Sequence, residues 1–95
     1  MKVMISQPMN GLTEEEILDN KRKAIIQLEA QGFEVVNSFF GSDHPGGALY
    51  CLGKSLEIMD GCDAVYFLKG WTDARGCRIE FLAALDYNKK VLFES

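Results

Sequence analysis

A carboxylate placed four residues after a glycine is the feature of this chain best suited to chemistry. Glu80 follows Gly76 by four residues and Cys77 by three, in a segment that we expect to be helical, so the three share one helix face. A helical side chain leans toward the amino end of its helix, and the Glu80 carboxylate should therefore face the space that Gly76 leaves empty. This spacing could present an anionic nucleophile to a small ligand.

The residues that join this helix to the preceding strand could complete the site. Residues 64–68 are expected to form a buried strand, and ligands of open α/β sheets bind at the carboxyl ends of the strands. Trp71 could stack on a base or pack across a subunit interface. Asp73 is most simply explained as the N-cap of the helix, although it could also bind a ligand. Arg75 opposes the helix dipole in the first turn, which favours a functional role.

A second group of candidate residues follows the first predicted strand, residues 2–6. The group consists of Ser6, Gln7, Asn10 and Gly11. Their hydroxyl, amide and backbone groups could contact a sugar or a phosphate. An ordinary turn explains the same residues, because an Asn-Gly pair favours positive φ. The position at the carboxyl end of a strand favours the binding role.

Alternating strand and helix patterns predict an α/β fold. Apolar runs predict strands at residues 2–6, 33–37, 64–68 and 90–93, and periodic patterns predict helices from Thr13 to Gly32, over 49–59 and from 73 or 74 to 87. Strands separated by helices require right-handed crossovers and hence a parallel sheet. We expect a three-layer, flavodoxin-like sheet of about four strands in the order 2-1-3-4, with helices on its faces and a crevice beside strands one and three. The glycine-rich segment between residues 37 and 49 is predicted to be a loop that could cover a binding site.

Composition limits the classes of function. Ninety-five residues, of which 47% are hydrophobic, predict a single domain over residues 1–95 with a small core. A core of this size favours a homo-oligomer. The formal net charge of −4 argues against a nucleic-acid polymer as partner. No apolar run is long enough to span a membrane, so we expect no membrane partner.

The cysteines and the lone histidine predict no metal site. Cys51, Cys62 and Cys77 are odd in number and lack the spacing of a metal site, which favours reduced cysteines in a cytoplasmic protein. His44 has no cysteine or carboxylate at metal-binding spacing and is expected to be solvated.

These motifs resemble the nucleoside 2-deoxyribosyltransferase superfamily, and within it the small, often phage-associated branch that is uncharacterised. The resemblance covers nearly the whole chain. It includes the Ser-Gln-Pro-Met-Asn-Gly loop at 6–11, Cys-Asp-Ala-Val at 62–65, Arg-Gly-Cys-Arg-Ile-Glu at 75–80 and Ala-Ala at 83–84. It implies that the glutamate of the Gly-x-x-x-Glu element, here Glu80, attacks the anomeric carbon of a nucleoside.

Two positions depart from the pattern of that superfamily. The transferases carry an aspartate eight residues before the strand-three aspartate, and this chain has Ser55 there. They carry a base-contacting aspartate six residues before the glutamate, where this chain has Ala74, with Asp73 one position away. Its position implies a substrate-binding role for Ser55. This chain lacks both aspartates at the positions of the transferases, so the resemblance does not assign the residues that recognise the base and protonate the leaving group.

We therefore expect an enzyme that acts on the N-glycosidic bond of a nucleoside or nucleoside monophosphate, as a transferase or a hydrolase, with no cofactor. Glu80 would form a glycosyl-enzyme intermediate. Arg75 and the loop 6–11 would hold the sugar or phosphate, and Trp71 would stack on the base. The alternative is a non-catalytic nucleotide-binding protein on the same fold, which the two departures favour. An FMN carrier is less favoured, because the loop after strand one lacks a run of hydroxyl residues.

Overall fold

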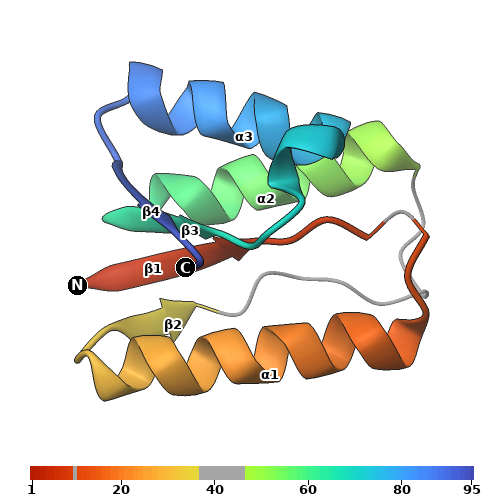
Figure 1. Cartoon of the computed structure of the whole chain (residues 1–95). Helices are drawn as coiled ribbons and strands as arrows, with labels where there is room; N and C mark the ends of the chain where they lie inside the picture. Colours follow the sequence, from red (N-terminus) through yellow and green to blue (C-terminus); the bar gives the residue numbers. More distant parts are fainter. Residues whose placement is uncertain (10, 37–46) are drawn as a thin grey trace.

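Strands and helices alternate along the computed structural model, which describes residues 1–9, 11–36 and 47–95. The elements are β1 (Lys2–Ser6), α1 (Glu14–Ala30), β2 (Glu34–Val36), α2 (Ala48–Asp60), β3 (Ala64–Phe67), the 3-10 helix η1 (Trp71–Asp73), α3 (Arg75–Asp86) and β4 (Lys90–Phe93). Figure 1 shows their arrangement. Asn10, His44 and most of the predicted loop at 37–49 lie outside the described residues.

The four strands form one parallel sheet in the order β2-β1-β3-β4, as predicted. The central strand β1 pairs with β2 on one side, where Val3 lies opposite Val35, and with β3 on the other, where Ser6 lies opposite Phe67. A parallel strand covered on both faces needs apolar residues in succession, which explains the run from Val3 to Ile5. The pairing with β2 ends at Met4 and the pairing with β3 continues to Ser6, so β3 holds the carboxyl end of β1 in place.

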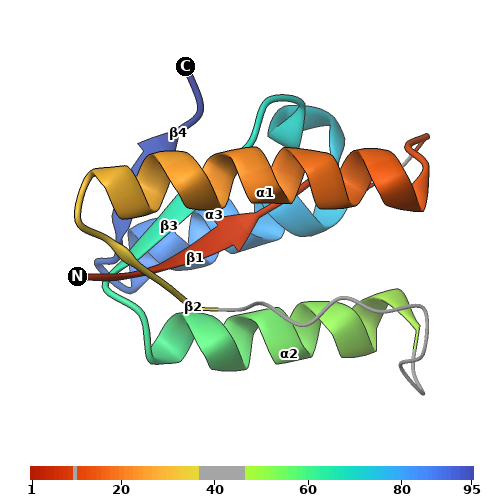
Figure 2. The same cartoon turned by 90° about the horizontal axis from the view of Figure 1, so that it is seen from below.

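Helices cover both faces of the sheet, which makes the fold a three-layer α/β structure. Figures 1 and 2 show α1 on one face, with α2 and α3 on the other. The core on the α1 side contains Val3, Ile5, Ala24, Leu28, Ala64, Tyr66 and Leu68. The core on the α2 and α3 side contains Met4, Met59, Cys62, Val65, Phe67 and Ala84. Successive residues of β1 thus point into alternate cores, as the strand period of two requires.

Thr13 caps the amino end of α1. The Thr13 hydroxyl oxygen accepts a hydrogen bond from the backbone N–H of Glu16 at 3.1 Å. Gly32 follows the helix with a φ of +89°, a conformation that glycine adopts without strain. Among the residues that the structure describes, no helix is long and apolar enough to cross a membrane.

The expectation that Asp73 caps α3 is wrong. Asp73 is the last residue of η1, and Ala74 occupies the N-cap position with φ −106° and ψ 120°. The 3-10 turn is closed by a hydrogen bond from the Ala74 N–H to the Trp71 carbonyl oxygen at 3.1 Å, so α3 begins one residue later than a cap at Asp73 requires. No side chain caps the first turn of α3.

Candidate functional site

A cleft of about 640 Å³ lies at the carboxyl end of β1, beside the amino-terminal turns of α2 and α3. This is the edge of a parallel sheet at which ligands bind, and the volume falls within the range of about 300–1,000 Å³ that is typical of small-molecule sites. The polar side chains among its described lining residues are Gln7 after β1, Ser55 on α2, and Arg75 and Glu80 on α3. The rest of the lining is mainly apolar.

Glu80 lies at the base of this cleft and is almost fully buried. Its side chain lines the cleft although the residue is only 6% exposed. The Ser6 hydroxyl donates a hydrogen bond to Glu80 Oε1 at 2.5 Å. Burial raises the pKa of Glu80 above its ordinary value, while hydrogen bonds from Ser6 and Ser55 lower the pKa and so act in the opposite direction. A carboxyl group whose pKa is shifted in this way, inside a cleft, is typical of a functional site.

The strand period explains why Ser6 reaches Glu80. Met4 and Ser6 are two residues apart on β1, so both side chains point to the face that α2 and α3 cover. The Ser6 carbonyl oxygen also accepts a hydrogen bond from the Leu68 N–H at 3.1 Å, which ties this residue to the segment after β3. Ser6 is 1% exposed and is not among the residues that line the cleft. The structure therefore places it behind Glu80, whereas the sequence suggested a ligand contact.

Gly76 and Arg75 lie at the cleft as expected. A Cβ atom added at Gly76 would meet no atom within 4 Å, so the space beside Glu80 is open on this side. Arg75 is the first residue of α3, and its exposed side chain lines the cleft. The first turn of α3 also has backbone N–H groups without a side-chain cap from Ala74, and both kinds of donor favour an anion.

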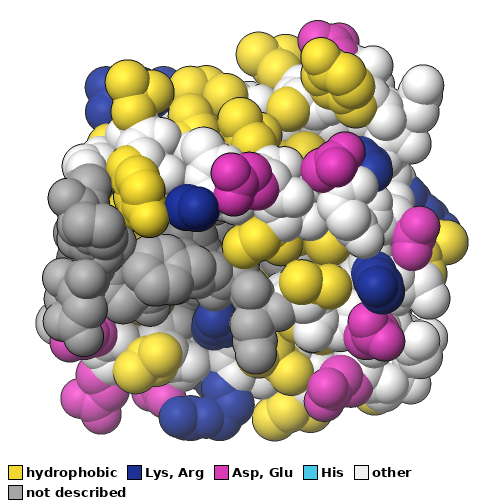
Figure 3. Space-filling view, turned by 180° about the vertical axis from the view of Figure 1, so that it is seen from behind, with side chains coloured by type: hydrophobic (Ala, Val, Ile, Leu, Met, Phe, Trp, Pro, Cys, Tyr) yellow, Lys and Arg dark blue, Asp and Glu magenta, His cyan; other side chains and the backbone are white. Residues whose placement is uncertain are grey.

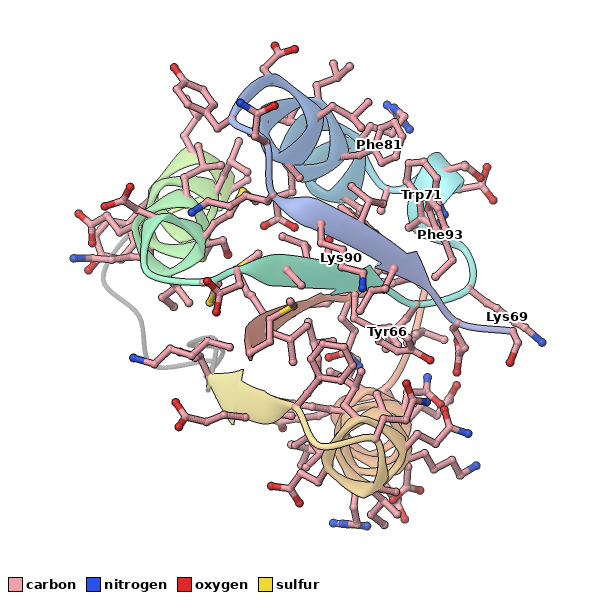
Figure 4. The ribbon with its side chains drawn as sticks, turned by 90° about the vertical axis from the view of Figure 1, so that its left-hand side faces the viewer. Tyr66, Lys69, Trp71, Phe81, Lys90 and Phe93 are labelled. Carbon is pink, nitrogen blue, oxygen red and sulfur yellow. The ribbon has the colours of Figure 1, made fainter. Side chains whose placement is uncertain are left out.

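Trp71 and Asp73 do not line the cleft. The Trp71 ring packs against Phe67, Phe81 and Phe93, with ring centroids 5.3, 4.7 and 5.6 Å apart. Figure 4 shows Trp71, Phe81 and Phe93 grouped beside β4. Asp73 is exposed at the end of η1. Neither residue is in position to contact a ligand that occupies the cleft.

The loop after β1 contributes in part. Gln7 lines the cleft, and its side-chain amide donates a hydrogen bond to the Ile17 carbonyl oxygen at 2.6 Å, which holds the loop against α1. Gly11 has a φ of +80°, which glycine adopts without strain, and the Leu12 N–H donates a hydrogen bond to the Met9 carbonyl oxygen at 3.2 Å. Asn10 itself lies outside the described residues.

Comparison with known protein families gives one match. The family described as "Domain of unknown function (DUF4406)" matches residues 1–93. The chain belongs to the DUF4406 family. No curated protein and no solved structure matches it.

Several residues that line the cleft of this DUF4406 chain were not anticipated from the sequence. They are Met9 after β1, Ala48, Leu49, Cys51 and Leu52 on α2, and Ile79 on α3. Their signal was helical spacing, because Cys51 and Leu52 precede Ser55 by four and three residues and so share its face. Within residues 1–9, 11–36 and 47–95, no group of three or more His, Cys, Asp and Glu side chains could hold a metal ion. Cys51, Cys62 and Cys77 form no disulfide in the described structure.

The burial of Glu80 predicts that Glu80→Gln stabilises the DUF4406 domain at neutral pH. Because folding raises the pKa of Glu80 above 4.5, its contribution to stability is largest below pH 4.5 and is lost as the pH rises through the raised pKa. The amide has no charge to bury. Urea unfolding of both proteins should therefore show an advantage for the variant at pH 7 that shrinks at pH 4.

The exposed Glu29 on α1 provides the matched control, since Glu29→Gln changes a carboxylate that is not buried. Equal differences between Glu80→Gln and the unchanged protein at the two pH values would contradict the prediction.

Proposed function

We propose that this protein cleaves the N-glycosidic bond of a nucleoside or nucleoside monophosphate, with Glu80 as nucleophile, and transfers the sugar to water or to a second base. The observation that carries the proposal is a buried carboxylate at the carboxyl end of β1, bonded to a hydroxyl and next to the open space at Gly76. The resemblance of the motifs to the nucleoside 2-deoxyribosyltransferase superfamily supports this chemistry over others that a carboxylate could perform.

The proposed reaction has two displacements. A carboxylate oxygen of Glu80 attacks the anomeric carbon, the bond from that carbon to the base nitrogen breaks, and the base leaves with the electron pair and takes up a proton. In the second step water or another base attacks the same carbon, and the ester bond to Glu80 breaks. Two inversions retain the configuration of the sugar.

The lining of the cleft suggests where the parts of such a substrate would bind. The apolar side chains of Met9, Leu49 and Leu52 offer a surface for a flat base. Arg75 and the first N–H groups of α3 offer donors for a phosphate or another anion. We propose the base contact for these apolar residues and not for Trp71, because Trp71 lies outside the cleft.

A non-catalytic nucleotide-binding protein is the second candidate, and the position of Ala74 favours it. Ala74 lines the cleft where the transferases carry an aspartate, and Glu80 is the one carboxylate among the described lining residues. Protonation of the leaving base then needs a proton from solvent or from the substrate itself. Binding of a nucleotide without release of its base would identify this function.

The enzyme hypothesis predicts that Glu80→Gln abolishes turnover. An amide keeps the shape of the side chain but is a far poorer nucleophile, so base release should fall to the rate in buffer. A panel of nucleosides and monophosphates is incubated with each protein, and free base is measured by chromatography. Exposed Glu29→Gln should retain full activity. Comparable base release by Glu80→Gln would rule out the covalent mechanism.

The anion site predicts that Arg75→Ala weakens a nucleoside monophosphate more than the matching nucleoside. Loss of a charge-assisted hydrogen bond costs about 1.5–3 kcal/mol, so affinity for the monophosphate should fall roughly tenfold to a hundredfold. Arg78→Ala is the matched control, because Arg78 is exposed on the same helix and donates to the Thr72 carbonyl oxygen at 2.9 Å, outside the cleft lining. Calorimetry that finds equal losses for both ligands would exclude a phosphate-binding role for Arg75.

We also propose that the protein is a homo-oligomer that uses the outer face of α3. Leu82 and Leu85 are spaced by three residues along this helix and are 59% and 50% exposed, and Ile79, three residues before Leu82, is 38% exposed and also lines the cleft. Figure 3 shows hydrophobic side chains gathered along the top of the view, over α3. Burial of such a face against a second copy removes apolar surface from water.

This proposal predicts that Leu82→Glu shifts the protein toward the monomer. Light scattering at micromolar concentration should give a multiple of the chain mass for the unchanged protein and the chain mass for the variant. Ile26→Glu places the same charge at a 62% exposed position on α1, on the other side of the sheet, and should leave the mass unchanged. A monomeric mass for the unchanged protein would count against the proposal.

A further inference from the structure

Two serine hydroxyls act on the Glu80 carboxyl group from different elements. Ser6, at the end of β1, donates to Glu80 Oε1 at 2.5 Å. Ser55, on α2, is 3% exposed and lines the cleft with Glu80, and its hydroxyl lowers the pKa of Glu80. Glu80 itself belongs to α3, so the two hydroxyls join its carboxylate to a strand and to a second helix.

Both serines are almost fully buried, like Glu80 itself. Ser6 is 1% exposed and Ser55 is 3% exposed. Ser6 does not line the cleft. Ser55 lines it together with Glu80 and lies one helical turn after Cys51 on α2. A buried hydroxyl needs a hydrogen-bond partner, and the Ser6 hydroxyl donates to the Glu80 carboxylate and also lowers the pKa of the Cys77 thiol.

We propose that Ser6 and Ser55 are positioning residues that hold the Glu80 carboxylate in its attacking geometry and keep its charged form accessible in a buried site. Removal of a carboxylate from water disfavours its charged form, and hydroxyl donors favour it. A carboxylate can accept about four hydrogen bonds. Two hydroxyl donors therefore leave lone pairs free to attack the anomeric carbon. The catalytic part of this inference rests on the proposed function, whereas the effect on the carboxyl group does not.

The remaining ionisable groups near Glu80 do not replace these hydroxyls. Among the described residues, those that line the cleft with Glu80 are Arg75 and Cys77 on α3 and Cys51 on α2, and none comes from β1 or β3. Burial raises the pKa of the Cys77 thiol, a hydrogen bond from Ser6 lowers it, and the charge of Glu80 raises it; the net shift is upward, so this side chain is neutral near pH 7. Arg75 is exposed at the mouth of the cleft, where water screens its charge.

The proposal is tested by the pKa of Glu80 in Ser6→Ala and Ser55→Ala, measured by NMR titration of carbon-13-labelled carboxyl groups. Each variant removes a donor to the charged form, so the ionisation constant should fall about tenfold, which raises the pKa of Glu80 by about one unit. Ser55→Thr keeps the hydroxyl and should restore the original pKa. Cys62→Ala is the control for truncation of a buried side chain. Cys62 precedes β3, at the amino ends of the strands and away from the cleft.

Kinetics separate positioning from substrate binding. If the unchanged protein releases base, the acid limb of kcat should move to higher pH in Ser6→Ala and Ser55→Ala, with KM nearly unchanged. A rise in KM with an unmoved pH profile would overturn the proposal, as would an unchanged pKa of Glu80 in both variants. Should Ser6→Ala not fold, Ser55→Ala and Ser55→Thr provide the test alone.

The positioning role of the serines and the proposed enzyme function can be refuted separately. The NMR titration needs no substrate, so a raised pKa without base release from any nucleoside supports the effect of the hydroxyls and refutes the enzyme function. Base release with an unshifted pKa in the serine variants supports the enzyme function and refutes the positioning role.

Discussion

The burial of one ionisable group, the Glu80 carboxyl, is the constraint on which the rest of this structure depends. A buried charge is costly unless hydrogen bonds compensate it, and here the compensation comes from hydroxyls on β1 and α2. Both partners must be held rigidly for these bonds to persist. The pairing of β1 with β3 extends to Ser6, opposite Phe67, and provides that rigidity, whereas the pairing with β2 ends at Met4.

The topology of the sheet brings the other parts of the site to the same place. Helices α2 and α3 begin at the edge where β1 ends, so their first turns supply both apolar walls and Arg75 to one cleft. The absence of a side-chain cap on α3 costs helix stability, but it leaves backbone N–H groups available to an anion. A helix without a side-chain cap and a buried carboxyl group both reduce the stability of the fold. Features of this kind are typical of functional sites.

The parts that followed from the sequence are those that depend on local spacing. The run from Val3 to Ile5 predicted a central parallel strand, and the strand and helix alternation predicted the order 2-1-3-4, because crossover handedness leaves few alternatives. The helical spacing of Gly76 and Glu80 placed both at the cleft. These predictions needed no knowledge of which distant residues meet.

The parts that did not follow depend on contacts between distant residues. Trp71 joins an aromatic group with Phe93, which lies 22 positions further along the chain, and no local pattern indicates that packing. Ser6 and Glu80 are 74 positions apart, so their hydrogen bond became apparent only in the folded chain. The error at Asp73 had a different origin, since an extra 3-10 turn delayed the helix by a residue.

The central claim is that Glu80 forms a covalent bond to a sugar, and the mass of the protein tests it most directly. The protein is mixed with a nucleoside that it cleaves, and the reaction is quenched with acid during turnover. The masses of the intact protein and of its peptides are then measured by mass spectrometry. The account predicts a population heavier by one glycosyl group, with the added mass on the peptide that contains Glu80. Base release accompanied by an unmodified Glu80, or by a glycosyl group on another residue, would contradict it.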